Sequence, residues 1–287
     1  MKKVKIITKI ENINAVCKRR LRTSAGVQEE SHRKKKNAKR ETSAAKRIKA
    51  LGRLRSILLL ILIALAAFVG ITAVDAVTCG QVHGDGIVCR KIGFITKEER
   101  YRDEDGGLKS EHQFTDVRNG DIFISMSTHT LGWRHGHAAI VIDAERGITL
   151  EAALWGKPSE KMRMRHWSSY ANAVHLRVSE EAAASALAAS GIARDTSIAA
   201  SAQLGCLAAA FAEEYENGVM YGLFSGIPDK APAPSAFEKT QCAHLVWYAY
   251  KQFGLDLDAD GSWLVTPRDI AKSDKLVVIE AFGDYEY

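Results

Sequence analysis

The stretch HGHAAIVIDAERGITLEAAL, residues 135–154, contains two short apolar runs separated by a turn. The runs 137–143 and 148–154 have the length of strands rather than helices, and Glu145-Arg146-Gly147 supplies the turn. The first run alternates poorly between apolar and polar residues, which is typical of a strand that is buried on both faces. Two such strands close together in the sequence predict a sheet at the centre of the fold.

Further strands and helices are expected on both sides of this pair. Three more strands are predicted, at 120–126 (GDIFISM), 173–178 (AVHLRV) and 275–282 (KLVVIEAF). Three helices are predicted, at 180–190, about 196–216 and 241–253. Strands in succession, followed by helices and a last strand, are typical of an α+β domain with an antiparallel sheet. We therefore expect one α+β domain over residues 119–287.

A long apolar segment precedes this domain. Residues 57–74 read ILLLILIALAAFVGITAV and include no charged side chain. At about 1.5 Å per residue this stretch nearly spans the hydrocarbon core of a bilayer, where only a helix satisfies the backbone. Residues 1–56 contain 19 Lys and Arg against 4 Asp and Glu. We predict a basic, disordered arm over 1–56 and a transmembrane helix over 57–76.

The charge asymmetry also predicts an orientation in the cell membrane. Lys and Arg concentrate on the cytoplasmic side, so we expect the arm inside the cell and the domain outside it, held by one span. A cleaved signal peptide, which would give a secreted protein, is the alternative, because Val74-Asp75-Ala76 resembles a cleavage site. Signal peptides usually run about 15–30 residues. The arm alone is longer than that, which favours an uncleaved anchor.

The formal charge of +6 for the whole chain is weak evidence for nucleic-acid binding. The arm has a net charge of +15, whereas the remaining 231 residues hold 21 Lys and Arg against 30 Asp and Glu, a net charge of −9. The arm also lacks the aromatic residues that accompany basic side chains in many nucleic-acid-binding segments. The sequence therefore favours anionic lipid headgroups, rather than a nucleic acid, as the partner of the arm.

Residues 77–118 are rich in charge and glycine and are predicted to be a juxtamembrane connector. Within it, Cys79 and Cys89 flank a turn signal; they could form a local disulfide, and free thiols are the alternative. Cys206 falls in an alanine-rich helical stretch and is expected to be a buried structural thiol.

Cys242 lies at the predicted start of the helix 241–253, with Thr240 or Lys239 as its cap. Backbone N–H groups and the helix dipole stabilise a thiolate at such a position. A cysteine nucleophile also needs a base and a group that orients the base. His137, at the start of one strand, and Glu151, in the next, are candidates for these roles. On the helix position alone, a buried core cysteine is the simpler interpretation.

Residues 119–275 resemble the circularly permuted branch of the NlpC-type papain-like amidases in the order of their motifs. These motifs are GDI, GHAAIVID, TLEA and CAHLVWYAYKQFGLDLDADGSWLVTPRDI. That branch includes YiiX/YycO-like proteins and, more distantly, lecithin retinol acyltransferase. The resemblance implies a permuted papain-like sheet with packed helices. It also implies a catalytic triad of Cys242 as nucleophile, His137 as base and Glu151 as orienting residue, with Tyr221 as a candidate oxyanion or positioning group. The sequence departs from the family at Ala243, where relatives often have serine, and in the alanine-rich insertion.

These expectations define a membrane-anchored, extracytoplasmic cysteine peptidase or amidase that hydrolyses amide bonds in cell-wall peptides (peptidoglycan). Ester or acyl-transfer chemistry on the same triad, and a wall-binding module without activity, are the alternatives. No cofactor or metal site is predicted. Asp256, Asp258, Asp260 and Gly261 resemble half of a calcium loop, but Pro267 occupies the position of the bidentate Glu, so a turn followed by a cap is the better interpretation.

Overall fold

The computed structural model describes residues 33–36, 39, 46–73, 86–93, 95–105, 107–110, 112–153, 156–216, 218–222 and 239–283. The chain divides into two compact units, Met1–Val69 and Gly70–Tyr287. Each unit is described by itself.

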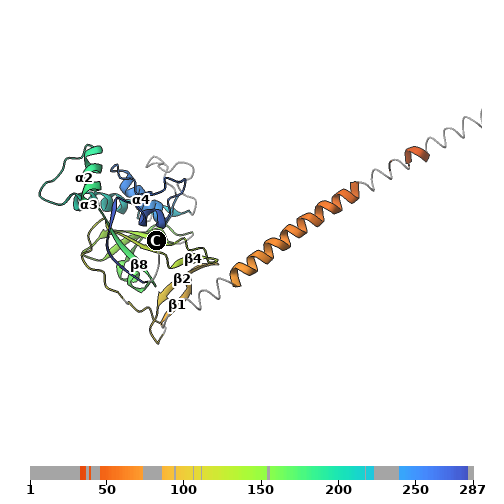
Figure 1. Cartoon of the computed structure of the whole chain (residues 1–287), viewed down its shortest axis with the longest axis horizontal. Coiled ribbons are helices and arrows are strands. Elements are labelled where there is room, and N and C mark those ends of the chain that lie inside the picture. Colours follow the sequence, from red (N-terminus) through yellow and green to blue (C-terminus); the bar gives the residue numbers. More distant parts are fainter. Residues whose placement is uncertain are drawn as a thin grey trace, which may run out of the picture. The chain divides into compact units, whose positions relative to one another are not determined.

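The described part of the first unit is dominated by one long helix, Lys46–Ala73, drawn in orange in Figure 1. It has 28 residues and contains an 18-residue window with a mean hydropathy of 2.7, none of which is buried. This helix is long and apolar enough to cross a membrane. It begins at Lys46, so residues 46–56 of the arm, which was predicted to be largely disordered, are helical. A helix that is nucleated in the apolar segment propagates at little cost through Ala, Leu, Lys and Arg, which are good helix formers.

The second unit is built on a six-stranded sheet with the order β11-β8-β3-β5-β6-β7, in which neighbouring strands are antiparallel. The strands are β3 (Ile122–Ser125), β5 (His137–Asp143), β6 (Ile148–Glu151), β7 (Glu160–Arg163), β8 (Ala173–Val178) and β11 (Leu276–Phe282). The mixed α+β class and the antiparallel sheet are confirmed, and β7 is a strand that the sequence did not predict.

Helices cover one face of the sheet, and Figure 1 shows α2, α3 and α4 gathered on that side. They are α2 (Glu180–Ala189), α3 (Ala200–Glu213), α4 (Cys242–Lys251) and the short α5 (Pro267–Ala271). Alternate residues of β5, namely Ala138, Ile140 and Ile142, pack into this main core. Cys206 of α3 is exposed rather than buried, because it falls on the solvent side of that helix.

The opposite face of the sheet carries a smaller core around Trp167 and Tyr170. Trp167 belongs to a 3-10 helix, η1 (Met164–Ser169), and both rings are almost fully buried. The residues of β5 that point to this face are His137, Ala139 and Val141. β5 is therefore buried on both faces, as its sequence predicts.

The segment 77–118, predicted as a connector, contributes strands to the second unit. β1 (Ile87–Lys91) and β2 (Thr96–Tyr101) form a three-stranded antiparallel sheet with β4 (Thr128–Thr130). Their sequences, IVCRK and TKEERY, are too polar to signal burial, yet Glu99 and Arg100 are buried and ion-paired. A two-stranded parallel pair, β9 (Met220–Tyr221) and β10 (Lys239–Thr240), leads directly into α4.

Candidate active site

Cys242 is the first residue of α4 and is 8% exposed. The helix is capped by Gln241, not by Thr240 or Lys239 as predicted: the Gln241 Oε1 accepts from the backbone N–H of Ala243 at 2.9 Å. The Gln241 Nε2 donates to the Val265 carbonyl at 2.6 Å, which fixes the cap. Thr240 has a different partner, since its Oγ1 lies 3.2 Å from His244 Nδ1. Cys242 is therefore held at a helix N-terminus, where the dipole favours a thiolate.

His137 begins β5 and is 6% exposed. It follows Gly136, whose φ is +74° and where a Cβ would lie 2.7 Å from the Met126 Sδ, so the backbone here requires glycine. The imidazole lies parallel to the indole of Trp167, with ring centroids 5.2 Å apart and 8° between the planes. Packing on this ring fixes the orientation of the imidazole.

Glu151 ends β6 and reaches His137 across the sheet. Val141 pairs with Thr149 and Ile140 with Leu150, so Glu151 and His137 lie on the same face as diagonal neighbours on adjacent strands. The distance from His137 Nε2 to Glu151 Oε2 is 2.7 Å. The contact predicted between the candidate base and its orienting group is thus present.

The Glu151 carboxylate is 1% exposed and receives several further donors. Its Oε1 accepts from Thr149 Oγ1 at 2.6 Å and from Trp167 Nε1 at 2.8 Å, and His166 Nε2 lies 3.3 Å away. Burial alone would raise the pKa of Glu151, but the charge of His166 and the bonds to the two histidines hold that pKa well below its usual range. Glu151 is therefore a carboxylate at neutral pH.

The protonation of His137 reflects both of its partners. Burial lowers the pKa of His137, whereas hydrogen bonds to Cys242 and Glu151 and their negative charges raise it to about 10. The imidazole therefore bridges Cys242 and Glu151 and is an imidazolium at neutral pH. An imidazolium next to a cysteine favours the thiolate form of that cysteine.

Replacing Cys242 by alanine is expected to lower the pKa of His137 from about 10 toward its ordinary value of 6.5, because Cys242 supplies the first of its raising contacts. The imidazole carbon signals of His137, followed by NMR against pH in the full chain in detergent, measure the change. Cys206→Ala, at an exposed cysteine, is the matched control and leaves the titration in place. An unchanged midpoint in Cys242→Ala would contradict the contact.

A cleft of about 460 Å³ opens onto Cys242 and His137. One wall comes from the loop between β1 and β2, with Ile92 and Ile95. The other walls come from the loop before β5, the end of β6 and β9, and include Trp133, Ala152, Lys157 and Tyr221. Burial, followed by the charge of Cys242, raises the pKa of Tyr221, so this side chain is a neutral phenol at neutral pH.

Two further histidines precede β5, His129 in β4 and His135 in the loop after it, and both have partners of their own. His135 lines the cleft, but its Nε2 lies 3.0 Å from Thr130 Oγ1 and its Nδ1 lies 3.0 Å from the Gly136 carbonyl. Burial lowers the pKa of His135. The His129 Nε2 lies 3.6 Å from Glu99. The histidine that forms a hydrogen bond with Cys242 is His137.

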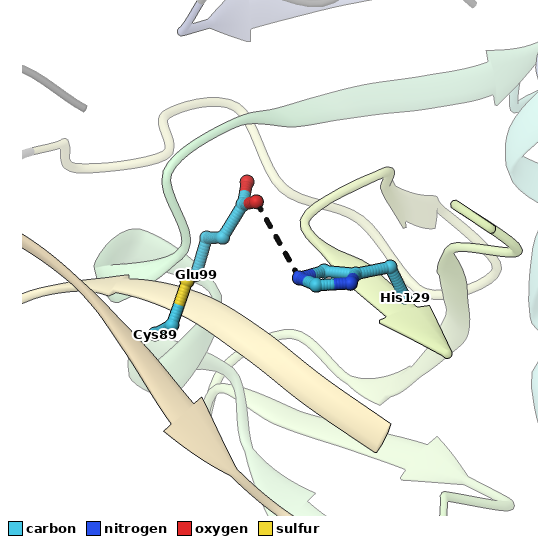
Figure 2. Close-up of side chains that lie close together, drawn as sticks. All are labelled: Cys89, Glu99 and His129. Atoms are coloured by element: carbon cyan, nitrogen blue, oxygen red, sulfur yellow. Dashed lines mark ion pairs between the residues drawn. The ribbon is translucent and has the colours of Figure 1, made fainter. Parts of the chain in front are cut away.

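A second cluster of chemically capable side chains comprises Cys89, Glu99 and His129, with potential ligand atoms within 4.8 Å of one another (Figure 2). Cys89 is disulfide-bonded, so its sulfur is neither a thiolate ligand nor a nucleophile. Glu99 receives both terminal nitrogens of Arg134, at 2.5 and 2.8 Å. The cluster fits a structural role better than a metal site. Cys79, which the sequence offered as a partner for Cys89, lies outside the described residues.

The acidic stretch after α4 brings Asp258 and Asp260 within 4.8 Å of Asp269. Asp269 forms a capping box with Thr266 at the start of α5, and Asp260 accepts from the Ser262 backbone at 2.8 Å. Asp256 binds Trp247 Nε1 and Lys251 Nζ, at 2.7 and 2.6 Å. These contacts agree with the interpretation of the stretch as a turn followed by a cap.

Four residues of the site were not predicted: Gln241, Thr149, Trp167 and His166. Thr149 carried a usable signal, because it lies two positions before Glu151 in a strand and so shares its face. Trp167 and His166 lie in RMRHWSSY, where no periodicity indicates an element. Their contribution depends on how η1 folds over the sheet.

Comparisons with known proteins add little to this geometry. No family model matches the chain, and no curated protein matches it. Among solved structures, the chain is similar to the crystal structure of metalloprotein yiiX from Escherichia coli O157:H7, DUF1105. The match has 12% sequence identity and a TM-score of 0.41, and it covers 59% of this chain and 100% of that one. A likeness at this level assigns neither a fold family nor an activity to this chain.

Proposed function

We propose that this protein is a cysteine hydrolase that cleaves amide bonds, with peptides of the cell wall as substrates. The observation that supports the proposal most strongly is the placement of His137 between Cys242 and Glu151. A nucleophile at a helix N-terminus, a base beside it and a buried carboxylate that orients the base form the arrangement used in nucleophilic catalysis. The order of these residues along the chain also favours a permuted papain-like fold.

In the proposed reaction the Cys242 thiolate attacks the carbonyl carbon of an amide. The S–C bond forms, and the carbonyl electron pair moves to oxygen. His137 then gives its proton to the amide nitrogen, the C–N bond breaks, and the amine leaves. Water next attacks the thioester, with His137 accepting its proton, and the carboxylic acid product leaves Cys242. Glu151 keeps the imidazole oriented throughout.

Two groups are suited to stabilise the negative oxygen formed in each addition. The backbone N–H of Cys242 belongs to the first turn of α4, whose N–H groups have no acceptor within the helix. Tyr221 lines the same cleft and is a neutral phenol, so it can donate a hydrogen bond. Preorganised donors of this kind account for about 2.7–4 kcal/mol of transition-state stabilisation each.

We place the catalytic domain outside the cell, anchored by the helix Lys46–Ala73, with its basic N-terminal side in the cytoplasm. The helix has the required length and hydropathy. The orientation follows from the concentration of Lys and Arg before the apolar segment. An extracytoplasmic location gives the domain access to cell-wall peptides.

An acyl ester or a lipid is the second candidate substrate, and the composition of the cleft favours it. Ile92, Ile95 and Trp133 present apolar surface to the cleft, and Trp133 is 58% exposed. Such walls suit an acyl chain as well as an apolar peptide side chain. The chemistry at Cys242 is the same for both substrates, because each offers a carbonyl carbon.

Incubation of the full chain in detergent with purified peptidoglycan, followed by mass spectrometry of the soluble products, tests the proposal. We expect released peptides with new amine and carboxylate ends, and none from Cys242→Ala. A parallel incubation with phospholipid vesicles detects acyl transfer or lipid hydrolysis. Products from the vesicles alone would reverse the order of the two candidates. If neither incubation gives products and Cys242 does not react with iodoacetamide at neutral pH, the proposal is contradicted and the domain is a binding module without activity.

A further inference from the structure

Glu151 lies between two histidines. His137 approaches Oε2 at 2.7 Å, and His166 of η1 approaches Oε1 at 3.3 Å. The two imidazoles differ in exposure, since the side chain of His166 is 17% exposed and that of His137 is 8% exposed. The reaction proposed for Cys242 uses only His137.

Both ring nitrogens of His166 face oxygen atoms. The Nδ1 lies 2.7 Å from the carbonyl oxygen of Arg163, and the Nε2 lies 3.3 Å from a carboxylate oxygen of Glu151. Both oxygens can only accept, so each ring nitrogen needs a proton to make a favourable contact. A doubly protonated ring therefore makes favourable contacts at both nitrogens. Loss of one proton would leave a lone pair facing an oxygen at one of the two contacts.

We infer that His166 is a positioning residue whose charge sets how strongly Glu151 acts on His137. The inference rests on the proposed function, because it assigns His166 a role in tuning the base of that reaction. With His166 protonated, two cations share one buried carboxylate. With His166 neutral, the whole negative charge of Glu151 acts on His137.

The direction of the effect follows from electrostatics in a buried site. A cation on the far side of Glu151 disfavours the imidazolium form of His137 and so makes it a stronger proton donor. The proposed reaction needs that property when His137 gives its proton to the leaving amine. The influence of His166 on Glu151 is large, because its charge comes first among the effects that lower the pKa of Glu151.

Other ionisable groups lie around His166 and contribute to the electrostatic potential at its ring. Arg100 of β2 donates to the His166 carbonyl oxygen at 2.5 Å and to Ser169 Oγ at 2.9 Å. The guanidinium of Arg100 lies over the ring of Tyr170, 3.3 Å from its centroid, and binds Glu98 at 3.0 Å. Against the effect of burial, Tyr170 and Glu98 raise the pKa of Arg100, and burial raises the pKa of Tyr170, so the guanidinium stays charged and the phenol neutral.

The test compares His166→Gln, which is always neutral, with His166→Lys, which keeps a positive charge at neutral pH. NMR titration of the His137 imidazole in the full chain in detergent is the readout. In His166→Gln we expect the His137 midpoint to rise by about one pH unit, and in His166→Lys to stay near its wild-type value. The pKa that governs the fall of the hydrolysis rate at alkaline pH is expected to rise in His166→Gln by the same amount as the His137 midpoint. A His137 midpoint that is the same in wild type and both variants would overturn the inference.

Wild-type protein alone provides a second test, which holds even where a variant fails to fold. The His137 signals should show a small additional step at the pH where the His166 signals titrate. A single-step titration of His137 would overturn the inference. Neither measurement depends on turnover, so an inactive Cys242 would contradict the proposed function while leaving the coupling between the two histidines intact.

Discussion

Replacing Glu151 by alanine is expected to lower the free energy of unfolding by about 3–5 kcal/mol, the range found when one partner of a buried ion pair is removed. The carboxylate is 1% exposed and is the acceptor for Thr149 Oγ1, Trp167 Nε1 and His137 Nε2. Alanine removes the acceptor of the Trp167 N–H and leaves Thr149 Oγ1 with the Met162 carbonyl, at 3.3 Å. It also leaves the imidazolium of His137 without its counter-charge.

Urea unfolding of the full chain in detergent, followed by tryptophan fluorescence, measures this loss. Glu151→Gln keeps an acceptor oxygen and the side-chain shape, so its cost is expected to be smaller than that of alanine. Glu145→Ala, at an exposed position in the turn before β6, is the control and should change stability by less than about 0.5 kcal/mol. A cost below about 1 kcal/mol for Glu151→Ala would contradict the buried network.

Replacing Cys242 by serine is expected to reduce hydrolysis by a factor on the order of 10³ or more while leaving the fold intact. A hydroxyl has nearly the shape of a thiol, so the core around α4 tolerates the change. The hydroxyl is far less acidic than a thiol, however, and His137 cannot hold it in the ionised form that attacks the carbonyl.

The rate of product release from whichever substrate the incubations with peptidoglycan and vesicles identify, compared with the urea midpoint of unfolding, separates an effect on chemistry from an effect on folding. Cys206→Ser is the matched control, because Cys206 is an exposed cysteine on α3 and takes no part in the cleft. Retention of more than a tenth of the wild-type rate by Cys242→Ser, with wild-type stability, would contradict its role as nucleophile.

The central strands were predicted well because their residues are mostly apolar, which is typical of buried strands. β5 was predicted at 137–143 and β8 at 173–178, and both occupy those residues. The strand β6 was predicted to continue to residue 154 but ends at Glu151, before the chain turns into the cleft. The helix 196–216 likewise shortens to Ala200–Glu213, since its first residues form a turn instead.

The arrangement around Glu151 was only partly predictable. His137 was a candidate because it begins a strand, and Glu151 because it is an acidic residue in the next strand, which requires a partner if it is buried. The same requirement is also met by Trp167 and His166, which come from an irregular segment that packs on the face of the sheet where His137 lies. No local pattern links that segment to β6, because the contact arises only when η1 packs onto the smaller core. The cap of α4 was missed for a similar reason, since Gln241 depends on the distant Val265 carbonyl.

The wall that β1 and β2 contribute to the cleft determines which fragments of the chain retain a complete cleft. Because Ile92 and Ile95 line the cleft, a fragment with a complete cleft must include β1 and β2 and cannot start at Asn119. A cut between Ala73 and Gly86 would leave β1 and β2 in the same chain as Cys242. A cut between Tyr101 and Asn119 would leave the ladder between β2 and β4 as the attachment of that wall. The position of a single cut would thus decide whether the cleft keeps a covalent link to one of its walls.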